Sequence, residues 1–255
     1  MEVEVIGPKG EPGQCYKCGE KGEWFKVEGL GFMGKNWLSS LQCGLCEKCF
    51  NVFEENKKKL DEQKRKDREL SKRSILLGGK RPALEFSFKQ ADPKLNSMSQ
   101  RIFRDFNPSQ ENIFVFGGTG TSKTFFSTCV AREALDAGKK ARVYNIRDLN
   151  AELREASMDG GEWALMDHLV SLDVLVIDDL GVGKINDFRI DGIMGILEKR
   201  DNALKRGLIV TSNIDLDGIA EVFSDRVSSR LRGMCKPPHG MVVEVKGTDA
   251  RLKVI

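Results

Sequence analysis

The sequence has no long apolar run. No segment approaches the roughly 18 uninterrupted apolar residues that a membrane helix needs. The first ten residues, MEVEVIGPKG, contain neither the basic flank nor the apolar core of a secretory signal, nor are they a transit peptide. These absences predict a cytoplasmic protein that does not engage a membrane. In that reducing compartment a disulfide framework is excluded as well.

The cysteines therefore need another explanation, because five of the seven fall within the first fifty residues. Two CxxC pairs separated by a couple of dozen residues have the spacing of a tetrahedral thiolate site, in which each pair forms a tight knuckle. The stretch between them is rich in glycine and aromatic residues, which is typical of a small ribbon that folds around a metal. We therefore predict a zinc-binding, zinc-ribbon-like domain over residues 1–53, with Cys15, Cys18, Cys46 and Cys49 as ligands.

Three alternatives for these cysteines stay open. Cys43 is a fifth candidate for four ligand positions and can replace Cys46 or Cys49. An iron site uses similar ligands. Reduced, buried cysteines without any metal are the third possibility.

The net charge of +3 is small, but the basic excess is concentrated in the middle of the chain. Residues 54–106 hold 15 Lys and Arg against 9 Asp and Glu. Within this stretch, residues 54–81 are so rich in charge that they predict a basic helical linker, which normally means a solvated helix. A basic arm that touches nucleic acid is the alternative. The paired glycines and the proline of LLGGKRP then mark a domain boundary before residue 82.

A glycine-rich loop follows the apolar run ENIFVF and precedes a helical stretch that ends near Gly138. A strand, a glycine turn and a helix in this order are the context that a phosphate-binding loop requires. The loop departs from GxxxxGK[ST] because Ser122 occupies the position of the second glycine. Lys123 is expected to reach the outer phosphates and the Thr124 hydroxyl to ligate magnesium. The predicted nucleotide-contacting residues are Gly117, Gly118, Thr119, Gly120, Thr121, Ser122, Lys123, Thr124 and Phe125.

The remaining segments alternate between buried-strand and helical patterns, which predicts an α/β fold with a parallel sheet. KARVYNI, LDVLVIDDLG and RGLIVTSN read as strands, and the two stretches between the first and second of them read as helices. Strand ends in such sheets meet at the ligand crevice. We therefore expect Asp178 to be the magnesium-side carboxylate, Asp179 to orient the attacking water, and Asn213 to lie at the same sheet edge.

The segment DLDGIAEVFSDRVSSRLRG, residues 215–233, is expected to form one helix with three arginines near its end. Arginines at this position can complement the helix dipole. They can also reach a nucleotide bound to a neighbouring subunit. The sequence leaves both readings open.

Four motifs in this order resemble the AAA+ ATPase module of the DnaC/DnaI helicase loaders and the related IstB transposition ATPases. They are GGTGTSKT (Walker A), VLVIDDLG (Walker B), EKRDNALKRGLIVTSN (sensor 1, Asn213) and SDRVSSRLR (the arginine-finger segment). The resemblance implies a P-loop AAA+ core at 82–255 with a parallel sheet sandwiched by helices and without a C-terminal lid. It also implies that Arg230 is the finger in trans, with Arg226 as its companion. Asp179 stands where many AAA+ proteins have Glu, although an Asp-Asp pair occurs in this family.

The resemblance implies ATP, Mg²⁺ and a bacterial or phage-infected cell. Three functions remain open. The first is an ATP-dependent loader that forms a homo-oligomer and binds a replicative DNA helicase and single-stranded DNA during replication. The second is an IstB-like transposition ATPase that binds duplex DNA and recruits a transposase. The third is a nucleotide-dependent binding module with little hydrolysis. Ser122 keeps the third open, since a serine there is expected to permit ATP binding and to slow turnover.

Overall fold

The computed structural model describes residues 24–25, 45–79, 81–91, 97–181 and 186–247. The chain divides into two compact units, Met1–Glu69 and Leu70–Ile255. In the first unit, β1 (Trp24–Phe25) pairs antiparallel with β2 (Leu45–Cys46). Cys46 lies in β2 and Cys49 in the first turn of the following helix, whereas Cys15, Cys18 and Cys43 lie outside the described residues. The zinc site therefore stays a prediction.

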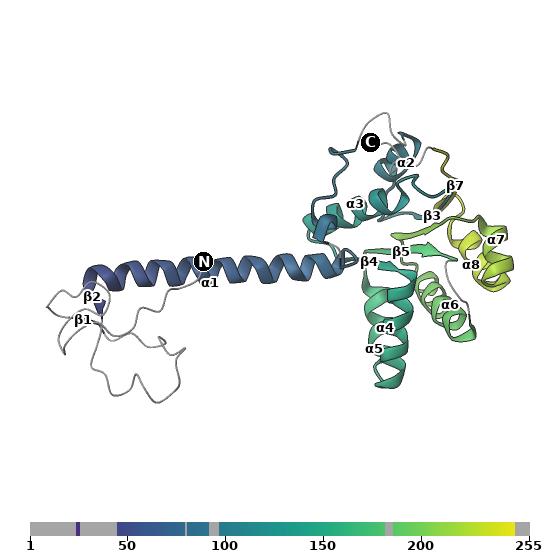
Figure 1. Cartoon of the computed structure of the whole chain (residues 1–255). Helices are drawn as coiled ribbons and strands as arrows, with labels where there is room; N and C mark the ends of the chain where they lie inside the picture. The colour runs from purple at the N-terminus through teal and green to yellow at the C-terminus, as the bar shows by residue number, and fades with distance from the viewer. Residues whose placement is uncertain (1–23, 26–44, 80, 92–96, 182–185, 248–255) are drawn as a thin grey trace. The chain divides into compact units, whose positions relative to one another are not determined.

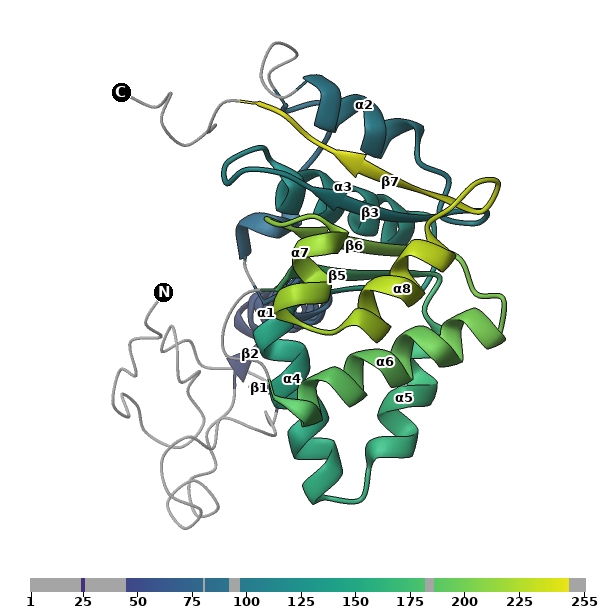
Figure 2. The ribbon, with the colours of Figure 1, turned by 90° about the vertical axis from the view of Figure 1, so that its right-hand side faces the viewer.

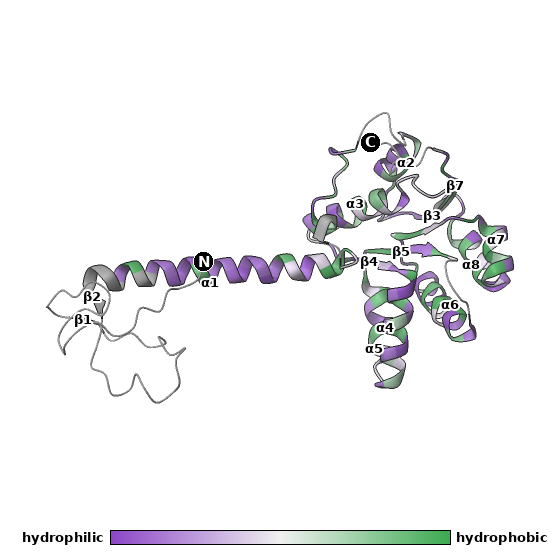
Figure 3. Cartoon of the chain, viewed as in Figure 1, coloured by the Kyte–Doolittle hydropathy of each residue, from purple (hydrophilic) through white to green (hydrophobic). Residues whose placement is uncertain are grey.

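Helix α1 (Glu47–Leu76) contains the charged stretch that the sequence singles out. Figure 3 shows that its surface is predominantly hydrophilic. Ion pairs between side chains one turn apart stabilise such a helix. Lys66 and Glu62, 2.9 Å apart, form one of them. At its end Arg73 forms an ion pair with Asp136, and Leu77 is buried in the core of the second unit. The packed core of that unit therefore begins before the glycine pair.

The second unit is built on five parallel strands in the order β4-β5-β6-β3-β7. The three central strands are buried along most of their length, as expected for a sheet covered on both faces. The strands are β3 (Asn112–Phe116), β4 (Ala141–Asn145), β5 (Val174–Leu180), β6 (Leu208–Ser212) and β7 (Gly240–Glu244). The helices are η1 (Arg81–Leu84), α2 (Ser97–Asp105), α3 (Lys123–Asp136), α4 (Ile146–Met158), α5 (Glu162–Ser171), α6 (Asp187–Asn202), α7 (Leu216–Val222) and α8 (Asp225–Met234).

Two apolar clusters lie on the two faces of this sheet (Figures 1 and 2). Successive strand residues point to opposite faces, so Val176 joins the cluster under α2 and α3, whereas Ile177 joins the cluster under α4 to α8. This arrangement confirms the predicted α/β fold with a parallel sheet sandwiched by helices. Among the helices in the described ranges, none has the length and apolarity to cross a bilayer.

The structure corrects one helix and adds two elements. The predicted single helix at 215–233 is two helices, α7 and α8, because the chain turns extended at Ser224 (φ −176°, ψ 134°). The Ser224 hydroxyl accepts a hydrogen bond from the Arg226 N–H and so begins a new helix. The sequence did not indicate α2, which is short and polar, or β7, an edge strand in which only Gly240 is buried.

Arg200 is a fully buried cation that joins α6 to the end of α5. Its guanidinium donates to the carbonyl oxygens of Leu169 (2.9 Å), Leu172 (3.0 Å) and Arg206 (2.7 Å). The first two carbonyls lie at the C-terminus of α5, where helical carbonyls lack intrahelical partners. Burial lowers the pKa of Arg200 to about 10, so the side chain stays charged at neutral pH and complements the helix dipole.

We expect Arg200→Met to lower the free energy of unfolding by about 3 kcal/mol, because several buried carbonyls lose their donor together. Urea denaturation measures the change. Arg232→Met is the control, since Arg232 is exposed and pairs with exposed Asp217, and such a pair contributes about 1 kcal/mol or less. Equal losses in the two variants would contradict the role of Arg200.

Candidate functional site

The glycine-rich loop joins the end of β3 to the start of α3. Gly117 has φ 148°, and a Cβ at this position would lie 2.1 Å from the carbonyl oxygen of Val245. Gly120 has φ 77°, in the region that side chains rarely adopt. The loop therefore requires glycine at 117 and favours it at 120. It directs the backbone into the N-terminus of α3, where the helix dipole and N–H groups that point along the axis favour phosphate.

Ser122 has φ 64° and ψ 20°, which is the left-handed conformation, and it forms the N-cap of α3 without a side-chain capping hydrogen bond. Position 122 thus has a positive φ, which glycine adopts without steric cost. A residue with a Cβ costs about 1–2 kcal/mol in this conformation relative to the right-handed region. The loop keeps the shape of a glycine loop at that cost, which is the basis for expecting that nucleotide binding survives the serine.

The loop is held by hydrogen bonds within it and by one hydrogen bond from α2. The Thr121 hydroxyl donates to the carbonyl of Gly118 (2.9 Å), and the buried Ser99 hydroxyl of α2 donates to the carbonyl of Thr121 (2.9 Å). Sequence analysis missed Ser99, because no local pattern indicates that α2 reaches the loop. The Phe125 ring packs against Phe86, with centroids 4.7 Å apart, so the ring belongs to the packing beneath the loop.

Lys123, the first residue of α3, is only 5% exposed. Its ammonium donates to the carbonyls of Gly117 (2.7 Å) and Gly118 (2.8 Å) and to the Asn213 side-chain oxygen (3.1 Å). Asn213 directly follows β6, so the lysine of the loop and the polar residue at the next strand end meet as the sequence predicts. An ammonium held at the loop can exchange these carbonyls for phosphate oxygens.

Thr124 and Asp178 also meet, although 54 residues separate them. The Thr124 hydroxyl lies 2.9 Å from both carboxylate oxygens of Asp178. Asp178 is 4% exposed, at the end of β5. A hydroxyl and a carboxylate are the hard oxygen ligands that Mg²⁺ takes at nucleotide sites, where substrate phosphates and water complete its octahedron. These two residues therefore fit magnesium.

Asp179 is in the left-handed conformation, with φ 60°, at an irregularity in the pairing of β5 with β6. Its N–H donates to the hydroxyl of Thr211 (3.1 Å), and the same hydroxyl donates to Asp178 (2.6 Å). Sequence analysis missed Thr211. The signal was present, because Thr211 precedes Asn213 by two residues, and alternate strand positions share a face.

The two predicted finger arginines lie elsewhere, on α8. Arg230 donates to Asp201 of α6 (3.0 Å) and lies 3.8 Å from Glu198. Arg226 is 69% exposed on its side chain and lies 4.0 Å from Glu198. In the single chain both arginines are thus paired with acidic residues of α6, beside a cavity of about 490 Å³ between α6 and α8.

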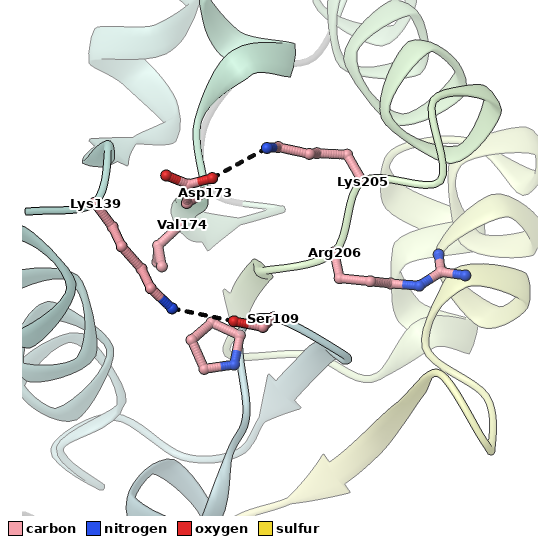
Figure 4. Close-up of a pocket in the computed structure, with 7 residues that line it drawn as sticks. Ser109, Lys139, Asp173, Val174, Lys205 and Arg206 are labelled. Carbon is pink, nitrogen blue, oxygen red and sulfur yellow. Dashed lines mark hydrogen bonds and ion pairs between the residues drawn. The ribbon is translucent and has the colours of Figure 1, made fainter. Parts of the chain in front are cut away.

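A second cavity, of about 250 Å³, lies near the opposite edge of the sheet, where strands begin (Figure 4). Lys139 donates to Ser109 and Lys205 pairs with Asp173, each at 3.1 Å, while Arg206 extends away from that pair. A hydrogen bond from the Lys140 N–H, followed by the contact with Lys205, lowers the pKa of Asp173. This cavity does not include any residue of the phosphate loop.

No group of three or more His, Cys, Asp or Glu side chains suited to a metal occurs within the described ranges. A magnesium site built from Thr124 and Asp178 does not need such a group, since substrate supplies further ligands. Among the predicted site residues, the structure therefore gathers Lys123, Thr124, Asp178 and Asn213 around the loop, with Asp179 beside them. Arg226 and Arg230 pair with acidic residues of α6 instead, and the predicted zinc ligands Cys15 and Cys18 fall outside the described residues.

Known proteins resemble part of this chain in sequence. The replicative helicase loader DnaC of Escherichia coli is 22% identical over 147 residues, which are 56% of this chain and 60% of that protein. An insertion sequence IS232 putative ATP-binding protein of Bacillus thuringiensis is 28% identical over 173 residues, or 66% of this chain and 67% of that protein. The chain thus spans about 60% of the length of the curated helicase loader.

Solved structures share the fold of the second unit. AMPPCP-bound DnaA from Aquifex aeolicus superposes with a TM-score of 0.55 at 21% identity, covering 67% of this chain and 53% of that one. The DnaC helicase loader superposes with a TM-score of 0.53 at 21% identity, covering 65% of this chain and 99% of the other. The family described as IstB-like ATP binding protein matches residues 48–254. Since this match takes in most of the sequence, the chain belongs to the family of IstB-like ATP-binding proteins.

Proposed function

We propose that the chain is a magnesium-dependent ATPase that acts as a helicase loader in DNA replication. The observation that supports the ATPase most directly is the convergence of Lys123, Thr124, Asp178 and Asn213 at one end of α3. These four side chains come from three separate segments, and each has the chemistry that its predicted role needs. Family membership supports ATP as the nucleotide.

In the proposed mechanism the loop N–H groups and Lys123 bind the outer phosphates and orient them in line for attack. Thr124 and Asp178 hold the magnesium ion, which supplies charge neutralisation on the phosphate oxygens when it is bound. Asp179 accepts a hydrogen bond from the attacking water and so fixes its direction. Asn213 accepts a hydrogen bond from Lys123 and so keeps the ammonium at the loop. Its side-chain amide also donates a hydrogen bond to the outermost phosphate in this proposal.

The proposed loader uses ATP to assemble a homo-oligomer that binds single-stranded DNA and a replicative helicase. Similarity to DnaC loaders from Escherichia coli and Buchnera aphidicola, at 22–25% identity, supports this choice. The predicted zinc-binding unit at residues 1–53 also supports the loader, because binding a helicase requires a separately folded unit. The chain's placement in the cytoplasm of a bacterial or phage-infected cell follows from the same proposal.

A transposition ATPase that binds duplex DNA and recruits a transposase is the second candidate. A specific observation favours it: the relative from an insertion sequence shares higher identity, 28%, over a longer alignment than DnaC does. A nucleotide-dependent binding module is the third candidate, supported by the strained Ser122 in the phosphate loop. In that case ATP acts as an assembly ligand, stabilising the bound state by mass action.

Capture and DNA-binding measurements separate the first two candidates. For a loader, we expect the immobilised chain with ATP to retain a purified hexameric replicative helicase and to bind a single-stranded oligonucleotide more tightly than the matching duplex. A transposition ATPase would prefer the duplex and retain a transposase instead. Salt must be held constant across the comparison, because electrostatic binding to nucleic acid changes steeply with ionic strength.

Two variants test the ATP site. Lys123→Ala should abolish ATP binding, because it removes the cation that faces the outer phosphates. Asp179→Asn should bind ATP normally and stop turnover, since an amide with the same shape cannot accept the proton or orient water in the same way. Calorimetric titration and phosphate release measure the two effects. Parallel loss of binding and turnover in Asp179→Asn would remove Asp179 from its proposed role.

Arg230→Ala tests the finger in trans. We expect the variant to bind ATP as a monomer but to lose nucleotide-dependent self-association, DNA binding and hydrolysis together, with turnover falling by roughly 10³ or more. Sedimentation with a non-hydrolysable ATP analogue and a single-stranded oligonucleotide measures assembly.

Asp201→Asn is the matched control for this variant, because it removes the negative charge that pairs with Arg230 while keeping Arg230 itself. If Arg230 only braces the two helices, both substitutions should cost a similar small amount of stability, about 1 kcal/mol or less for so accessible a pair, and both should leave assembly intact. An Arg230→Ala protein that still assembles with ATP would make Arg226 the next candidate.

A further inference from the structure

Thr211 is a fully buried threonine in β6 that contacts both aspartates at the end of β5. Its hydroxyl donates to one carboxylate oxygen of Asp178 at 2.6 Å. The same hydroxyl accepts a hydrogen bond from the backbone N–H of Asp179 at 3.1 Å. One side chain from the neighbouring strand is therefore bonded to the proposed magnesium ligand and to the proposed water-orienting residue.

A hydroxyl suits this position because it donates one hydrogen bond and accepts others. An ionised carboxylate only accepts, so Asp178 needs a donor on its sheet side if its orientation is to be fixed. Thr124 approaches the carboxylate from α3, and Thr211 approaches it from β6. With donors from two elements, the carboxylate is oriented before any ion binds.

The hydrogen bond from the Asp179 N–H to Thr211 stabilises the backbone conformation of Asp179. A register irregularity takes Asp179 out of the ladder between β5 and β6, and its φ of 60° is in the left-handed region. A residue held in that region costs of order 1–3 kcal/mol and persists only where its surroundings enforce it. The Thr211 hydroxyl provides the acceptor that the displaced N–H requires, and it thereby helps to hold the conformation that directs the Asp179 side chain.

We propose that Thr211 is a positioning residue that aligns the magnesium ligand Asp178 and the water-orienting Asp179 with each other. This inference rests on the proposed ATPase function. Thr211 touches neither nucleotide nor metal in this role and acts only through the two aspartates. Asn213, which directly follows β6, accepts a hydrogen bond from Lys123. The β6 segment therefore contacts the loop lysine, the Asp178 carboxylate and the Asp179 backbone.

Thr211→Val tests the proposal, because valine matches threonine in shape but has no hydroxyl. We expect nucleotide affinity without magnesium to be unchanged. The gain in affinity on adding magnesium should shrink, the magnesium concentration for half-maximal turnover should rise, and kcat should fall about 10- to 100-fold with little change in KM, as is typical for partners of metal ligands. A fluorescent ATP analogue, titrated with and without magnesium, measures the first two effects independently of turnover.

Three further variants sharpen the result. Thr211→Ser keeps the hydroxyl and should restore both magnesium dependence and kcat. Thr211→Cys, with a weak donor, should fall between serine and valine, and it also keeps the test usable if the valine variant folds poorly. Ser212→Ala is the matched control, since Ser212 is equally buried on the same strand but donates to the Leu180 carbonyl instead.

Two results would overturn the role of Thr211. The first is a Thr211→Val protein with the magnesium dependence and kcat of the unmodified chain. The second is a Ser212→Ala protein with the same losses as Thr211→Val, which would mean that any buried hydroxyl of β6 matters only for folding. An unmodified chain that shows no magnesium-dependent nucleotide binding would instead overturn the proposed function on which this role depends.

Discussion

The contact between Thr124 and Asp178 is the interaction on which the candidate site depends. It joins the first turn of α3 to the end of β5, and both carboxylate oxygens lie 2.9 Å from the hydroxyl. This contact forms only if β3 and β5 run parallel with β6 between them, so that their carboxyl ends lie at one edge. The burial of the sheet under two apolar layers therefore brings together a hydroxyl and a carboxylate that fit magnesium, beside the glycine-rich loop.

Backbone strain is concentrated at this same edge. Ser122 and Asp179 both adopt the left-handed conformation, and they flank the Thr124 and Asp178 pair on the α3 side and the β5 side. Such residues persist where surrounding packing enforces them, and they occur often at functional sites. At Ser122 the loop glycines and α2 supply that enforcement, and at Asp179 the Thr211 hydroxyl does so. Ser122 is thus held in a conformation that glycine would adopt without steric cost.

The arginines of α8 illustrate a different constraint, because a residue that acts on a neighbouring subunit cannot be recognised in one chain by its contacts alone. Arg230 is bonded to Asp201 and lies near Glu198. An arginine that binds the phosphate of a neighbouring subunit is expected to pair with a carboxylate in the isolated chain. An arginine that only stabilises the contact between two helices pairs with a carboxylate as well. The two roles differ in their effect on nucleotide-dependent self-association, and they do not differ in their effect on the stability of the single chain.

The sequence by itself determined the glycine-rich loop, most strands and helices between residues 112 and 213, and the placement of Lys123, Thr124, Asp178 and Asn213 at one sheet edge, although it indicated neither α2 nor β7. It could do so because local spacing places each of these residues at the end of a strand or the start of a helix. Only the tertiary structure decided that Ser99 braces the loop, that Arg200 caps α5, that Ser224 separates α7 from α8, and that Thr211 joins the two aspartates. Most of these depend on contacts between segments far apart in the chain. Local spacing can place Thr211 on the same strand face as Asn213, but only the fold decides which partner lies 22 or 33 residues away.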